Sequence, residues 1–176
     1  MSLKPLLLLI LLCFCSLKLV AQEPDGKFKF HNITTGTGAY TLEKIKGNRG
    51  FSVSITTNFR IKKNVIGINW NGGFGASNKD DILKNAIHSY SEINLLYGRE
   101  FNIARNLFLN AYAGFGFTDQ TKLRDDRTEG TVGFPVRSEI VFKASKWIDV
   151  GAIGNVNFNK RNNIHSFQVL LRFNFN

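Results

Sequence analysis

The chain of 176 residues has the length of one domain, and with 43% hydrophobic residues, 16 phenylalanines and 3 prolines it is too apolar for a disordered chain. Its formal net charge is +10, and both cysteines, Cys13 and Cys15, lie near the N-terminus. If that segment is removed, the mature protein can have no disulfide framework, no catalytic thiolate and no cysteine-ligated metal.

Residues 1–21 have the layout of a secretory signal peptide. Lys4 precedes an apolar run from Pro5 to Cys15, and Ala21 supplies a small residue before Gln22. The apolar run is well short of the ~20 residues that a membrane-spanning helix needs. We therefore expect an exported protein, with a signal peptide at 1–21 and one domain at 22–176.

Period-two alternation of apolar and polar residues dominates the rest of the chain and is typical of strands with two different faces. In the clearest run, every odd residue from Phe51 to Ile61 is apolar or β-branched, and every even residue is Ser, Thr, Asn or Arg. A weaker strand within 28–41 comes first, and similar runs follow at 66–74, 93–98, 107–117, 132–142, 148–158 and 167–175, which makes eight. A helical pattern is found only at 79–87, which a loop would explain equally well.

The connections between these runs differ in length. Those near 62–64, 102–106 and 145–146 are short, whereas those at 75–88 and 119–130 are long and charged. Tight turns at one end, extended loops at the other and an even number of strands of about 10–12 residues are typical of a transmembrane β-barrel. The predicted fold class is therefore all-β, an eight-stranded antiparallel up-and-down transmembrane barrel.

A soluble barrel would also alternate, with its apolar face inward, so the two faces must be distinguished. The polar face consists of Ser, Thr, Asn and Gly with isolated charges, and the lysines lie almost wholly in connections or at strand ends. In water, the opposite face would be a very large exposed apolar patch. This favours a polar lumen and a lipid-facing apolar wall. The charged residues expected in the lumen are Arg60, Glu92, Arg137, Glu139, Lys143, Asp149 and Arg172.

We expect Lys143 to face Asp149 across the 145–146 turn. Because an unpaired charge in a narrow lumen is unfavourable, Arg137 and Glu139 are expected to pair with Glu92 and Arg60 or with nearby asparagines.

Aromatic residues of the apolar face concentrate toward the strand ends, as expected for two belts at headgroup depth. The belt at the tight-turn end comprises Phe59, Tyr97, Phe142, Trp147, Phe173 and Phe175, and the belt toward the loop end comprises Phe51, Phe74, Phe115, Phe117, Phe134 and Phe158.

From about residue 28 onward, the chain resembles the small eight-stranded outer-membrane barrels of the OmpA/OmpX type. The resemblance rests on the signal peptide, the alternating strands, the loop asymmetry and the aromatic final strand FQVLLRFNF. That strand resembles the signal read by the barrel-assembly machinery, although it ends on Asn176 and not on an aromatic residue. The resemblance implies the outer membrane of a Gram-negative-type bacterium, with outer-membrane lipid and lipopolysaccharide as partners. We expect no periplasmic domain of the kind that larger members of this family carry.

The sequence predicts no catalytic, metal or cofactor site. None of the three histidines, His31, His88 and His165, has a second histidine at metal-ligand spacing. The segment 88–92, HSYSE, contains the residue types of a hydrolytic triad, but in a strand its serines point away from its histidine and glutamate.

We therefore expect a non-enzymatic outer-membrane barrel with a structural or surface-interaction role carried by its loops. The alternatives are a lipid-modifying barrel similar to lipid A deacylases and a narrow solute channel. The positive charge suggests anionic headgroups, and no nucleic acid is expected as a partner.

Overall fold

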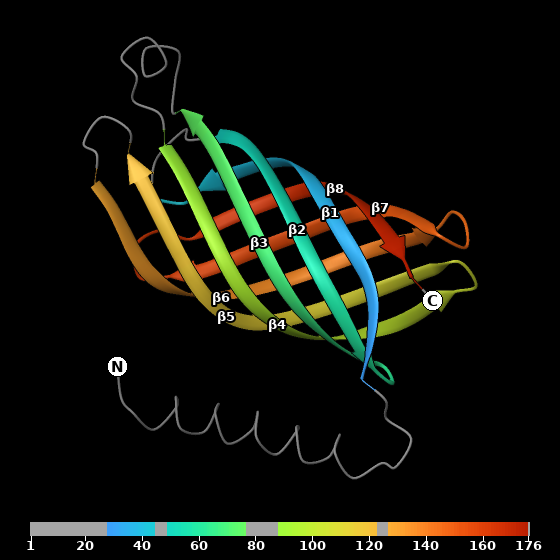
Figure 1. The fold of residues 1–176 in the computed structure, drawn as a ribbon. Coiled ribbons are helices and arrows are strands. Elements are labelled where there is room, and N and C mark those ends of the chain that lie inside the picture. The colour runs from blue at the N-terminus through green and yellow to red at the C-terminus, as the bar shows by residue number, and fades with distance from the viewer. Residues whose placement is uncertain (1–27, 45–48, 77–87, 123–126, 176) are drawn as a thin grey trace.

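The alternating runs form eight antiparallel strands that close into one barrel (Figure 1). The structure is a computed structural model and describes residues 28–44, 49–76, 88–122 and 127–175. Each strand pairs with its neighbour in sequence, and β1 pairs with β8 to close the sheet. The strands are β1 (Lys29–Leu42), β2 (Arg49–Ile61), β3 (Asn64–Ala76), β4 (His88–Ala104), β5 (Leu107–Lys122), β6 (Arg127–Lys143), β7 (Ile148–Asn159) and β8 (Ile164–Asn174).

The two faces of the seven strands β2 to β8 follow the predicted parity. On β2, Ser52 and Thr56 are buried in the lumen, whereas Phe51 and Ile55 are exposed on the outer wall. This is the arrangement of a barrel with a polar inside and an apolar outside. Among the described residues, no helix is both long enough and apolar enough to cross a membrane.

Several strands are longer than the predicted 10–12 residues, and β4 and β6 have 17 each. Most of the predicted long link at 119–130 is strand, because β5 continues to Lys122 and β6 begins at Arg127. The pair Thr118↔Thr131 supports the extension, since cross-strand threonines stabilise a sheet. The charged residues of this segment therefore do not mark a loop.

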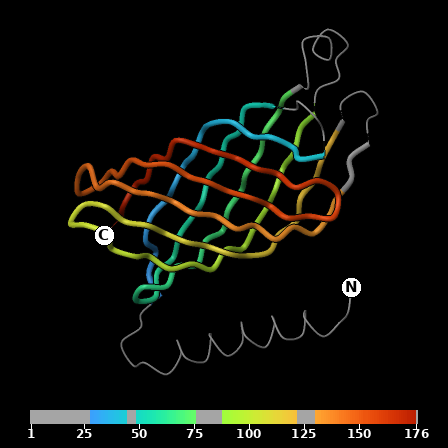
Figure 2. The backbone as a smooth tube through the Cα atoms, turned by 180° about the vertical axis from the view of Figure 1, so that it is seen from behind, coloured from blue at the N-terminus to red at the C-terminus, as the bar shows by residue number. Residues whose placement is uncertain are grey.

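The connections are therefore less uneven than predicted. The tight-turn end has links at 62–63, 105–106 and 144–147, and the opposite end, called here the loop end, has links at 43–48, 77–87, 123–126 and 160–163. The helical pattern at 79–87 lies outside the described residues. The C-terminus lies at the tight-turn end, beside the β4–β5 and β6–β7 turns (Figure 2).

Candidate functional site

A buried ion cluster in the lumen is centred on Glu139 of β6, which is 1% exposed. Nε of Arg137 donates to its Oε1 at 2.9 Å, and Nη2 of Arg172 donates to its Oε2 at 2.6 Å. Nδ2 of Asn110 and the hydroxyl of Tyr112 also donate to Oε2, at 3.1 and 3.4 Å. Arg137 and Glu139 are two residues apart on one strand, so both side chains face inward, whereas Arg172 comes from β8.

Arg137 connects this cluster to the opposite wall of the barrel, because its Nη1 donates to Oγ1 of Thr56 on β2 at 3.0 Å. Nε of Arg172 donates to Oγ1 of Thr34, its register partner on the neighbouring strand β1, at 3.4 Å. Because β2 and β6 lie across from each other in an eight-stranded barrel, the cluster spans the lumen.

The observed ion pairs differ from the expected ones. Arg137 and Glu139 pair with each other and with Arg172. Arg60 pairs with Glu100, which the sequence analysis did not single out although it shares the inward parity of Glu92 on β4. Which charges meet depends on how far strands shift around the closed barrel, and alternation along one strand contains no such information.

Glu92 is 0% exposed and has amide neighbours in place of an arginine. Its Oε2 accepts a hydrogen bond from Nδ2 of Asn94 at 3.0 Å. The same Nδ2 also lies 3.2 Å from Oδ1 of Asn69, whose own Nδ2 donates to Thr56 at 2.9 Å. A chain of amides therefore links Glu92 to the wall that Arg137 reaches.

Apolar side chains close the lumen on either side of these polar layers. They stand at inward positions of otherwise polar faces, which the sequence analysis did not note. Toward the loop end, the ring centroids of Tyr40 and Tyr90 lie 4.7 Å apart. Among the described residues the buried apolar clusters are Tyr40, Leu42, Tyr90 and Ile164; Val65, Leu96 and Tyr112; and Val141, Ile153 and Leu170.

At the tight-turn end, the lumen opens into a cavity of about 340 Å³. Lys143 and Asp149 are opposite each other in register, as expected, and both line this cavity. Lys143 is exposed, whereas Asp149 is buried and its Oδ2 accepts a hydrogen bond from Nδ2 of Asn174 at 2.9 Å.

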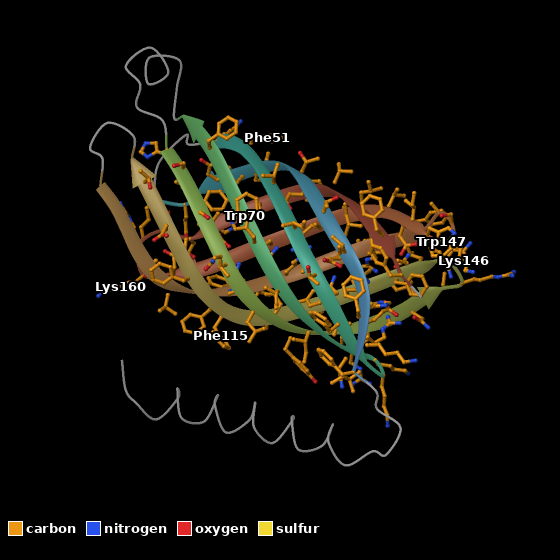
Figure 3. All side chains as sticks on the ribbon, in the orientation of Figure 1. Phe51, Trp70, Phe115, Lys146, Trp147 and Lys160 are labelled. Carbon is orange, nitrogen blue, oxygen red and sulfur yellow. The ribbon has the colours of Figure 1, made fainter. Side chains whose placement is uncertain are left out.

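Aromatic side chains cover the outside of the wall, and Figure 3 labels Phe51, Trp70, Phe115 and Trp147 along it. Phe59 is half-buried because Phe28 stacks on it at 4.9 Å, and Phe28 was not among the predicted belt residues. Near the loop end, the rings of Phe51 and Phe74 lie 6.0 Å apart. The other predicted belt residues are all exposed, namely Tyr97, Phe115, Phe117, Phe134, Phe142, Trp147, Phe158, Phe173 and Phe175.

The segment 88–92 does not converge on one point. Tyr90 and Glu92 are buried in the lumen, whereas Ser91 is exposed and its Oγ accepts a hydrogen bond from Nε1 of Trp70 at 3.1 Å. Within the described ranges, no three His, Cys, Asp or Glu side chains gather as a metal site.

No protein-family model matches the chain, and no curated protein matches its sequence. Solved structures share its fold. Neisserial surface protein A (NspA) is 12% identical with a TM-score of 0.67, and the match covers 83% of this chain and 97% of NspA. For the N-terminal β-barrel domain of Pseudomonas aeruginosa OprF, the identity is 10%, the TM-score 0.55 and the coverage 85% and 100%. For Ail of Yersinia pestis, these values are 12%, 0.50, 82% and 97%. The fold is thus that of the small eight-stranded outer-membrane barrels.

Proposed function

We propose that the protein is an integral outer-membrane barrel with a closed lumen, which serves as a structural element or presents its loops for interaction at the cell surface. The observation that carries this proposal is the filled interior, in which the Glu139 cluster spans the lumen and apolar side chains pack on both sides of it. An eight-stranded barrel is just wide enough for its own side chains to fill.

The outer wall supports the membrane location. Large apolar side chains from all eight strands are exposed on it, including Ile68 at 54%, Ile93 at 64% and Val169 at 66%. In water, such a wall would be a far larger apolar patch than monomeric soluble proteins expose, whereas lipid tails match it. The NspA, OprF and Ail barrels, which share the fold, agree with this location.

Two measurements on purified protein test the proposed function against its alternatives. In planar lipid bilayers, the closed lumen predicts no stepwise conductance, and discrete ion-selective steps would instead indicate a channel. In incubations with lipid A, no ester-linked acyl chain should be released. Release that is lost in His88→Ala would instead establish a lipid-modifying enzyme.

The topology gives a further prediction. We infer that the loop end faces the cell exterior, as its longer connection at 77–87 suggests. Trypsin added to intact cells should therefore cleave after Lys79 or Lys84 and leave Lys62 and Lys146 in the tight turns uncut, as read by mass spectrometry of the fragments. Cleavage at Lys62 or Lys146 from outside would reverse this orientation.

A further inference from the structure

A groove of about 470 Å³ lies on the outer wall and crosses β6, β7, β8 and β1. Register places Ser138, Gly154, Phe167 and Ala39 in one outward row across these four strands. Because the side chains of Ser138, Gly154 and Ala39 are small, the outer surface is recessed there. Phe167 projects beside them with 66% of its surface exposed. The next row toward the loop end also lines the groove and consists of Val136, Val156, His165 and Thr41.

The glycine at the bottom of this groove is not required by the packing of the barrel. A Cβ atom at Gly154 would meet only Oγ of Ser138, at 3.5 Å, which is an ordinary contact distance. At Gly38 and Gly151, by contrast, a Cβ atom would lie 2.1 and 2.0 Å from a backbone carbonyl oxygen of the next strand. Gly154 therefore leaves open space on the lipid side that a larger residue would fill without disturbing the sheet.

A group of basic residues, called here the basic rim, borders the groove at the loop end. Thr41 pairs in register with both Arg49 and His165. Arg49 therefore continues the row of the groove that lies nearer the loop end. Lys44 and Lys160 stand in the adjoining connections, and Nζ of Lys44 donates to the carbonyl oxygen of Lys160 at 3.2 Å. The members of the basic rim, Lys44, Arg49, Lys160 and His165, are all exposed. Figure 3 places Lys160 at the end of the barrel opposite to Lys146.

An apolar groove at lipid depth bordered by cations at headgroup depth is complementary to a lipid that carries phosphate. We propose that the groove and the basic rim bind one molecule of lipopolysaccharide through its lipid A part. An acyl chain lies in the groove, and the phosphates contact Arg49, Lys44 and Lys160, with His165 as a further donor. This inference rests on the proposed function, because it requires a barrel in the outer membrane with its loop end outward.

Lipid A fits the basic rim better than a phospholipid does, and better than a second copy of the chain. Its phosphates stand at both ends of a disaccharide, which matches cations spread over a strand row and two connections, whereas a phospholipid brings one phosphate. A second copy packed on this face by a two-fold axis along the membrane normal would bring two basic rims together, and like charges repel.

The test is native mass spectrometry of the detergent-folded, delipidated protein mixed with bis-phosphorylated lipid A, with its dephosphorylated form or with phosphatidylglycerol. Wild type should give a one-to-one adduct with bis-phosphorylated lipid A that is at least tenfold more abundant than with either other lipid. Gly154→Leu should reduce this adduct at least tenfold, and Thr57→Leu, on the outer face of β2 away from the groove, should leave it unchanged. The double variant Arg49→Gln/Lys160→Gln should remove the preference for phosphate, whereas Lys63→Gln at the tight-turn end should keep it.

Folding is followed separately by the heat-dependent shift of each variant on gel electrophoresis, and Ser138→Leu fills the same groove from β6 if Gly154→Leu does not fold. Adducts of equal abundance for wild type and the groove variants, or for all three lipids, would overturn the lipid site. This outcome would not contradict the proposed membrane barrel. A dimer that Gly154→Leu abolishes would assign the groove to a second copy. Recovery of the folded wild-type protein without detergent or lipid would instead contradict the proposed function itself.

Discussion

Replacing Glu139 by glutamine is expected to lower the free energy of unfolding of the detergent-folded barrel by about 3–5 kcal/mol, because removal of one partner leaves buried charge uncompensated. The Glu139 carboxylate holds both Arg137 and Arg172, which are 3% and 2% exposed. Glutamine has nearly the same shape as glutamate, so the decrease in the free energy of unfolding reflects the lost charge and not the creation of a cavity. Urea titration followed by tryptophan fluorescence and gel mobility measures the change.

Glu92 supplies the matched control on the same inward surface. It is as buried as Glu139, but its hydrogen-bond partners are side-chain amides, that of Asn94 among them. Among the described residues no arginine pairs with it, so Glu92→Gln removes a charge without leaving a buried cation unpaired. We expect its free energy of unfolding to stay within about 1 kcal/mol of wild type or to rise, since a buried carboxylate without a cation is itself unfavourable. If both variants lose the same stability, the pairing with arginine is not what stabilises the lumen.

Introducing a charge on the outer wall should have an effect of similar size that depends on depth. Ile55 is 46% exposed at the middle of β2, so Ile55→Arg is expected to destabilise the barrel in lipid bilayers by about 2–4 kcal/mol. Ile61 lies on the same face at the tight-turn end of the same strand, and Ile61→Arg should change stability by about 0–1 kcal/mol. Urea unfolding from vesicles measures both variants. Equal effects at the two positions would show that this face does not cross a bilayer.

Much of the architecture could be predicted from the sequence because the period of a strand determines which side chains share a face. The alternation from Phe51 to Ile61 predicted both the strand and its buried residues, and similar runs predicted the number of strands. The predicted link at 119–130 was wrong for a local reason. Its charged residues favour a loop, but Thr118 of β5 and Thr131 of β6 pair with each other and continue the sheet.

The partners within the lumen could not be predicted in the same way. Arg172 reaches Glu139 from two strands away, and Arg60 meets Glu100 on β4, because the tilt of the strands brings together residues that are distant in the pairing order. Apolar residues such as Leu96 and Leu170 also point into the lumen, at the same parity as their polar neighbours. The alternation does not predict them, because it assigns polar residues to the lumen and apolar residues to the outer wall. The groove was not foreseen either, since it depends on small residues that only the register of four strands brings into one row.

The outer wall of this barrel is expected to lie in lipid, and the two tryptophans of the chain allow a direct test. Trp70 is 42% exposed at the middle of β3, whereas Trp147 lies in the β6–β7 connection at the tight-turn end. In vesicles of phospholipids brominated at defined depths, the fluorescence of Trp147→Phe, which retains Trp70, should be quenched most by bromines near the bilayer centre. The fluorescence of Trp70→Phe should be quenched most by bromines near the headgroups. If the brominated lipids do not quench Trp70 and aqueous iodide does, the outer wall does not lie in lipid.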